Sequence, residues 1–141
     1  MIYIPATWHP LDPAVIEKTT MTFAASPDSP SAPLDDHLVM VAIRSFRRDP
    51  PFASAGAFAD ALQSSVFTGV DITREPGTLA SGDVVFLRYV HTTRSGRAIA
   101  ETDALFVNAG VGWILSTEAP VEQWQQYAPT FRQVFERFRP A

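Results

Sequence analysis

Three consecutive segments in the second half of the chain have the composition of β-strands and are separated by tight-turn sequences. Residues 83–93 and 97–107 are rich in Val, Ile, Phe and Thr, and they flank the dipeptide Ser95-Gly96. The turn sequence Asn108-Ala109-Gly110 then precedes a third apolar run at 111–117. Short turns of this kind join neighbouring antiparallel strands, so we expect a three-stranded meander.

The first turn also predicts which residues of the meander face each other. If Ser95 and Gly96 form a two-residue turn, Arg94 lies opposite Arg97 and Arg88 lies opposite Asp103. Val84 then faces Val107, Phe86 faces Leu105, and the two opposite charges are paired. We therefore predict this register.

The C-terminal segment 120–138 has the pattern of an amphipathic helix. Pro120 suits the first turn of a helix, whereas Pro129 falls inside and should kink or restart it. Large apolar residues recur at helical spacing along one side. They are Trp124, Tyr127, Phe131, Val134, Phe135 and Phe138.

The remaining segments complete an α+β chain. We expect strands at 15–25, 37–46 and 70–75, the last closed by a Pro76-Gly77 turn, and a short strand at 2–4. Residues 54–67 are predicted to form a helix with Ser54 as its N-cap, and 26–36 a loop. The predicted fold is one α+β domain over 1–141, an antiparallel sheet with the C-terminal helix packed on one face.

A candidate binding surface follows from the two faces of the predicted hairpin. The bulky helix should cover the face with the small residues Ala100, Thr102 and Ala104. The opposite face would then carry Arg88, Glu101 and Asp103, whose burial without partners would cost several kcal/mol each. We therefore expect that face to be partly open and these three residues to bind a partner. An ion pair on a solvated face and an acid–base pair are the alternatives.

The composition argues against several other kinds of site. The chain has no Cys, so thiolate metal sites, disulfides and Cys nucleophiles are excluded. His9, His37 and His91 lie far apart in sequence, and neither a Gly-x-Ser-x-Gly nor a phosphate-binding glycine motif occurs. No catalytic residue, metal or cofactor is predicted. A net charge of −4 with scattered arginines disfavours nucleic acid, and no segment reads as a membrane span or signal peptide.

The two ends of the chain resemble PsbP-like domains, a superfamily that includes DcrB-like, LpqN-like and Mog-like proteins. Residues 116–140 are similar to the closing strand and aromatic helix of that superfamily, and Ile4-Pro5-Ala6-Thr7-Trp8 is similar to its opening segment, with Thr7 in place of the usual Gly. The resemblance implies an antiparallel sheet flanked by helices and an accessory role without catalysis. It carries over no functional residue.

These observations lead to a non-enzymatic adaptor, accessory domain or secretion chaperone of the DcrB-like kind. Its partner would be a protein such as a secretion effector, and a homodimer is compatible with the sequence. The chain would be cytoplasmic. Two alternatives stay open: an exported LpqN-like accessory lipoprotein domain whose leader was removed, hence periplasmic or at the cell surface, and a small-molecule-binding protein or small enzyme with a pocket between sheet and helix.

Overall fold

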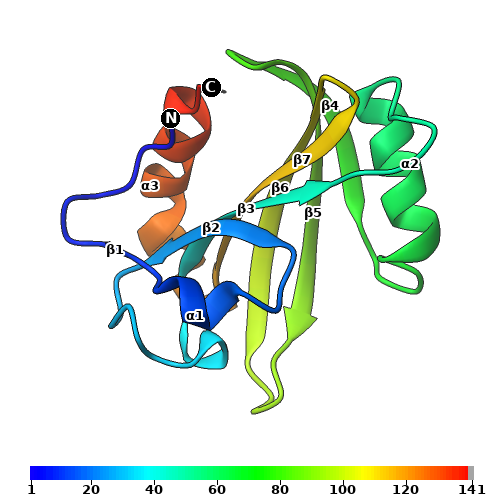
Figure 1. Ribbon diagram of the computed structural model, residues 1–141. Helices are drawn as coiled ribbons and strands as arrows, with labels where there is room; N and C mark the ends of the chain where they lie inside the picture. Colours follow the sequence, from blue (N-terminus) through cyan, green and yellow to red (C-terminus); the bar gives the residue numbers. More distant parts are fainter. Residues whose placement is uncertain (140–141) are drawn as a thin grey trace.

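The computed structural model describes residues 1–139 and contains a seven-stranded antiparallel sheet with helices on both faces (Figure 1). Pro140 and Ala141 lie outside the described residues. Pro140 is the last residue of the segment compared with PsbP-like domains, and Ala141 is the last residue of the predicted domain. The strands lie side by side in the order β1-β2-β3-β7-β6-β5-β4. The elements are β1 (His9–Pro10), α1 (Pro13–Ile16), β2 (Met21–Ser26), η1 (Leu34–Asp36), β3 (Met40–Phe46), α2 (Ala55–Ser65), β4 (Thr73–Leu79), β5 (Gly82–Thr92), β6 (Ala98–Asn108), β7 (Val111–Pro120), η2 (Val121–Gln123) and α3 (Trp124–Arg137).

The predicted meander is confirmed and forms the centre of the sheet. Strands β5, β6 and β7 pair in the order of the chain. The whole of β3 pairs with the side of β7 that faces away from β6. Ala109 and Gly110 have positive φ values of 52° and 77°, as a tight hairpin turn requires. The predicted α+β class is therefore correct.

The predicted register of the β5–β6 hairpin is wrong by one residue. Arg88 lies opposite Thr102, and Leu87 lies opposite Asp103. The loop contains three residues rather than two, because the Thr93 N–H donates to the Arg97 carbonyl at 2.9 Å and Gly96 adopts a left-handed conformation with φ 87°. A glycine at the end of a three-residue loop is the usual way to close such a hairpin. A one-residue slip moves every side chain of β5 to the other face.

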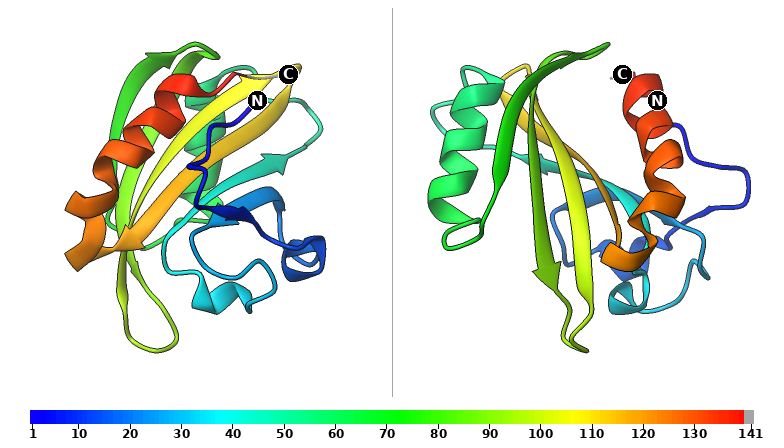
Figure 2. Two further views of the ribbon diagram at one scale, coloured as in Figure 1. Left: turned by 90° about the vertical axis from the view of Figure 1, so that its left-hand side faces the viewer. Right: turned by 180° about the vertical axis from the view of Figure 1, so that it is seen from behind.

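Helix α3 covers one face of the sheet, which we call the α3 face, as Figure 2 shows from behind. The prediction that it packs on Ala104 and Thr102 of β6 is confirmed, since both residues are buried there. Phe131 packs against Trp124 with ring centroids 5.2 Å apart and against Trp8 at 6.4 Å. Trp8 thereby fixes the N-terminal segment on the helix.

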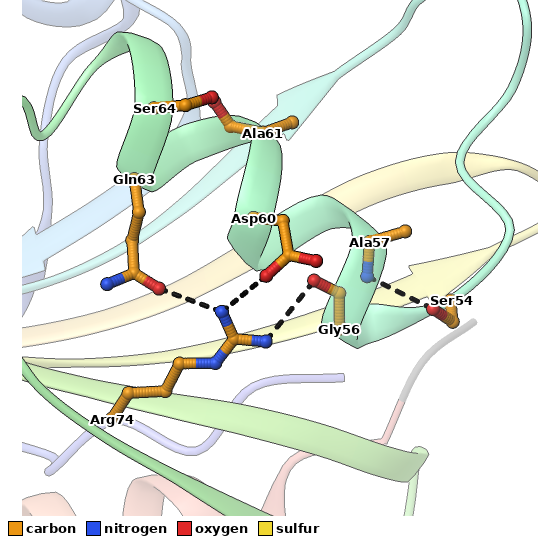
Figure 3. Close-up of polar contacts among 8 residues, drawn as sticks. All are labelled: Ser54, Gly56, Ala57, Asp60, Ala61, Gln63, Ser64 and Arg74. Carbon is orange, nitrogen blue, oxygen red and sulfur yellow. Dashed lines mark hydrogen bonds and ion pairs between the residues drawn. The ribbon is translucent and has the colours of Figure 1, made fainter.

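Helix α2 covers part of the opposite face, which we call the α2 face (Figure 2). Ser54 caps the helix as predicted, because its hydroxyl accepts a hydrogen bond from the Ala57 N–H at 3.1 Å. Phe58 is fully buried against the sheet. Arg74 of β4 ties the helix to the sheet edge, with its guanidinium bonded to Asp60 at 2.6 Å and to Gln63 at 2.9 Å (Figure 3).

The other end of the α2 face is covered by the segment that contains α1. Ile16 packs there with Met40 and Ala42. The predicted strand over 15–25 is therefore half wrong, because Pro13 begins a short helix and extended structure starts only at Met21. The strand predicted at 2–4 does not form. Pro76 and Gly77 lie within β4 rather than in a turn, and proline is tolerated on such an edge strand.

Gly112 of β7 provides a test of how tightly α2 packs on the sheet. A Cβ atom added there would lie 2.7 Å from the ring of the buried Phe58. We expect Gly112→Ala to lower the free energy of unfolding by about 1–3 kcal/mol, because the overpacked core must shift. Urea denaturation measures this. The control Gly56→Ala, where the nearest atoms would be 3.8 Å away, should leave stability unchanged or raise it slightly.

Candidate functional site

A group of polar side chains lies on the α2 face between the region under α2 and the region under α1. Three neighbouring strands supply them, and their positions follow from the alternation of side chains along a strand. Glu101 lies opposite Tyr89 on one side and opposite Glu118 on the other. We call this group the carboxylate cluster; it comprises Tyr89, His91, Glu101, Asp103 and Glu118.

Tyr89 holds two of the carboxyl groups together. Its hydroxyl is hydrogen-bonded to an oxygen of Glu101 and lies 2.8 Å from Asp103 Oδ2. Asp103 is 1% exposed and Glu101 6%, so neither carboxyl is well solvated. One hydroxyl proton cannot serve both acceptors at once. A proton on Asp103 completes a chain in which Asp103 donates to Tyr89 and Tyr89 donates to an ionised Glu101.

His91 lies between the two glutamates. Its Nε2 is 3.2 Å from Glu101 Oε1 and 3.4 Å from Glu118 Oε2. The Nε2 atom is buried and makes no contact of hydrogen-bond geometry with residues 1–139. The rest of the side chain is 40% exposed, so the cluster reaches the surface at His91.

Burial and mutual proximity shift the pKa of every ionisable member. The Glu101 and Glu118 carboxylates raise the pKa of His91 to about 10. Burial raises the pKa of Asp103 well above its ordinary value, and it raises that of Glu118 to about 7. Burial acts in the same sense on Glu101, but its contacts with His91, Asp103 and Glu118 outweigh that effect and lower its pKa. The cluster therefore holds carboxyl groups in two different protonation states at neutral pH.

Arg44 of β3 lies at the border of the cluster. Its guanidinium donates a 2.7 Å hydrogen bond to the Ser116 hydroxyl, and its charge helps to stabilise ionised Glu101. A cavity of about 190 Å³ beside it is lined by Glu118, Met40 and the loop around His37.

The structure separates the three residues that the sequence predicted as a partner-binding face. Arg88 projects on the α3 face, where it pairs with Glu75 of β4. Glu101 and Asp103 lie buried on the α2 face. The expectation of an open face shared by all three is wrong, because the hairpin register is shifted by one residue. Partner binding by any of them stays a prediction.

Tyr89, His91 and Glu118 were not predicted from the sequence as members of a cluster. The two-residue turn placed Tyr89 and His91 on the wrong face of β5. Glu118 looked like a charge before a helix, whereas β7 continues through it to Pro120. Gly96 is the residue that indicates the observed register, because a left-handed glycine is common in the last position of a three-residue hairpin loop.

A second feature lies at the edge of β5. Strand β4 pairs with β5 only as far as Arg88, but β5 continues to Thr92. Hydrogen-bonded and non-hydrogen-bonded residue pairs alternate along an antiparallel hairpin, and the Thr93–Arg97 hydrogen bond fixes which pairs are which. Val90 falls in a non-hydrogen-bonded pair, so its backbone N–H and C=O groups point away from β6. A groove of about 450 Å³ runs along this edge, which we call the edge groove. Its lining is Asp71, Thr73, Arg88, Tyr89, Val90, Ala100, Glu101, Thr102 and Trp124.

The raised pKa of Glu118 predicts how stability depends on pH. Because the folded state binds this proton more tightly than the unfolded state, stability falls as pH rises from about 4.5 to about 7. We expect Glu118→Gln to remove roughly 2–3 kcal/mol of this decline. Urea denaturation between pH 5 and 8 measures the slope. The exposed Glu136→Gln control should keep the wild-type slope, and an unchanged slope in Glu118→Gln would contradict the assignment.

Comparison with known proteins shows the fold and no closer relationship. No family model matches the sequence, and no curated protein matches it. The structure is similar to CyanoP, the cyanobacterial PsbP of Synechocystis sp. PCC 6803, with a TM-score of 0.58, 11% identity, and coverage of 94% of this chain and 81% of that one. It is similar to PA94 of Pseudomonas aeruginosa, a protein of unknown function, with a TM-score of 0.57, 13% identity and coverage of 99% and 86%.

A third similar structure is LpqN of Mycobacterium tuberculosis, a protein involved in cell envelope biogenesis. Its TM-score is 0.51 at 13% identity, with coverage of 98% of this chain and 80% of that one. Within residues 1–139, no helix is long and apolar enough to cross a membrane. At these identities the likeness concerns architecture alone, and the chain has the PsbP-like fold that the sequence resemblance implied.

Proposed function

We propose that this chain is an accessory domain that binds a protein partner, and that an extended segment of the partner pairs with β5 in the edge groove. The unpaired edge of β5 is the observation that carries the proposal. An exposed strand edge offers unused backbone hydrogen-bonding groups and is a recurrent binding site for extended peptides.

The two edges at this end of the sheet differ in their suitability for pairing. The outer edge of β4 contains Pro76, which has no N–H and interrupts a hydrogen-bonding ladder. The stretch of β5 beyond Arg88 has no proline, and Val90 is 55% exposed there. Strand addition at β5 is therefore favoured over strand addition at β4.

The side chains around the edge groove define the partner segment. Val90 and the partly buried Trp124 offer an apolar contact. Arg88 and Asp71 offer one charge of each sign on the groove wall, with Arg88 already paired to Glu75. An extended segment with an apolar residue at the position facing Val90 matches this surface, since alternate side chains of an added strand point to one face.

Such a domain could serve as an adaptor or secretion chaperone of the DcrB-like kind, or as an exported accessory domain. The PsbP-like fold supports an accessory role of either sort, and the edge groove serves both equally. Fractionation of cells that produce the full-length protein at its native level separates them, because the exported form is recovered outside the cytoplasm.

The backbone contact itself can be tested at Val90. In Val90→Pro the outward N–H is removed while the hydrogen bonds between β5 and β6 stay intact. Val90→Thr is the matched control, since it keeps both the N–H and the β-branched shape. We expect quantitative pull-down from cells of the source organism to recover a protein with wild type and Val90→Thr, and at least tenfold less of it with Val90→Pro.

Two further measurements complete this experiment. Circular dichroism and urea denaturation should show that Val90→Pro is folded. Arg88→Ala should weaken recovery of the same protein if the partner segment follows the groove past Glu75. Equal recovery by wild type, Val90→Pro and Val90→Thr would overturn the proposal.

A further inference from the structure

The carboxylate cluster has the composition of a divalent-cation site. His91, Glu101 and Glu118 each offer one nitrogen or oxygen atom, and the three atoms lie within 4.8 Å of one another. An imidazole nitrogen combined with carboxylate oxygens is a donor set typical of zinc and neighbouring transition metals. Calcium and magnesium bind oxygen ligands instead.

Two of the three separations between the donor atoms agree with a shared metal ion. Zinc lies about 2.0–2.2 Å from nitrogen and oxygen ligands in a tetrahedral site, which places two such ligands about 3.3–3.5 Å apart. His91 Nε2 lies 3.2 Å from Glu101 Oε1 and 3.4 Å from Glu118 Oε2. The three residues come from adjacent strands β5, β6 and β7, so the sheet holds the spacing rigidly.

Two buried polar atoms of the cluster have no hydrogen-bond partner among residues 1–139. His91 Nε2 is buried and, among residues 1–139, has no partner of hydrogen-bond geometry, although it faces two carboxylates. Asp103 is almost fully buried, with 1% of its surface exposed. Its Oδ1 atom also has no hydrogen-bond partner among residues 1–139. Asp103 is joined to Glu101 through Tyr89, so this buried acid supports the residue that would bind the ion.

The surroundings of the cluster are suited to a cation. The guanidinium of Arg44, which is bonded to Ser116, offsets part of the charge of Glu101 and Asp103. A bound cation would take the place of the proton that His91 holds between Glu101 and Glu118. Tyr89 orients Glu101 in the manner of the outer hydrogen bonds that fix metal ligands. The His91 side chain is 40% exposed, so the cluster lies next to the protein surface.

We propose that His91, Glu101 and Glu118 bind one zinc-type divalent cation, oriented by Tyr89 and Asp103. This site lies on the opposite face of β5 from the Val90 side chain, and it does not depend on partner binding at the edge groove.

The test is titration of the metal-depleted protein with ZnCl₂ by isothermal calorimetry, together with the visible spectrum of the Co²⁺ form. We expect one Zn²⁺ per chain and a raised thermal unfolding temperature with excess Zn²⁺. His91→Gln and Glu118→Gln should each weaken binding at least about 30-fold and abolish the Co²⁺ band. Tyr89→Phe should weaken binding about 10- to 100-fold, as loss of an outer hydrogen bond does.

Matched controls separate the site from adventitious binding. His9 and Glu136 are exposed, so His9→Gln and Glu136→Gln should bind Zn²⁺ like wild type. Circular dichroism verifies that each variant is folded, and Mg²⁺ in large excess should not displace Zn²⁺. The proposal is overturned if wild type binds no stoichiometric Zn²⁺, or if the site variants and the controls bind it equally.

Discussion

The two-sided burial of β6 is the constraint on which the rest of the structure depends. Every residue from Ile99 to Phe106 except Ala100 is buried, with α3 packed on one face of the strand and α2 on part of the other. Alternate residues of β6 therefore enter two separate cores. Glu101 and Asp103 fall in the set that faces α2, so the chain must neutralise two carboxyl groups inside the protein rather than leave them in water.

Neighbouring side chains, rather than water, stabilise these two carboxyl groups. Tyr89 and His91 of β5 stand on the same face as Glu101, and Arg44 of β3 approaches it across β7. A buried carboxylate without such partners costs several kcal/mol, which is a large share of the stability of a domain this size. The cluster thus occupies the gap between two apolar regions, and its members are determined by register rather than by proximity in sequence.

That dependence on register explains what the sequence could and could not predict. The apolar runs of β5, β6 and β7 and the aromatic stripe of α3 are local patterns, so the strands, the helix and the face that α3 covers on β6 were predicted correctly. The cluster depends on one extra loop residue, Arg94, which reverses the faces of β5 and is accommodated by the left-handed Gly96. Strand β7, which supplies Glu118, continues to Pro120 opposite Ile99, and this pairing of residues distant in sequence is not visible in the local pattern.

Strand β5 links the edge groove to the carboxylate cluster. Along β5, the side chains of Val90 and His91 point to opposite faces, so one enters the surface of the edge groove and the other enters the carboxylate cluster. Glu101 and Tyr89 line the groove as well as forming the cluster. A segment that pairs with the edge would restrict the motion of the same backbone that carries His91. Any coupling between partner and cation would therefore pass through the stretch 89–92, where β5 has only one neighbouring strand.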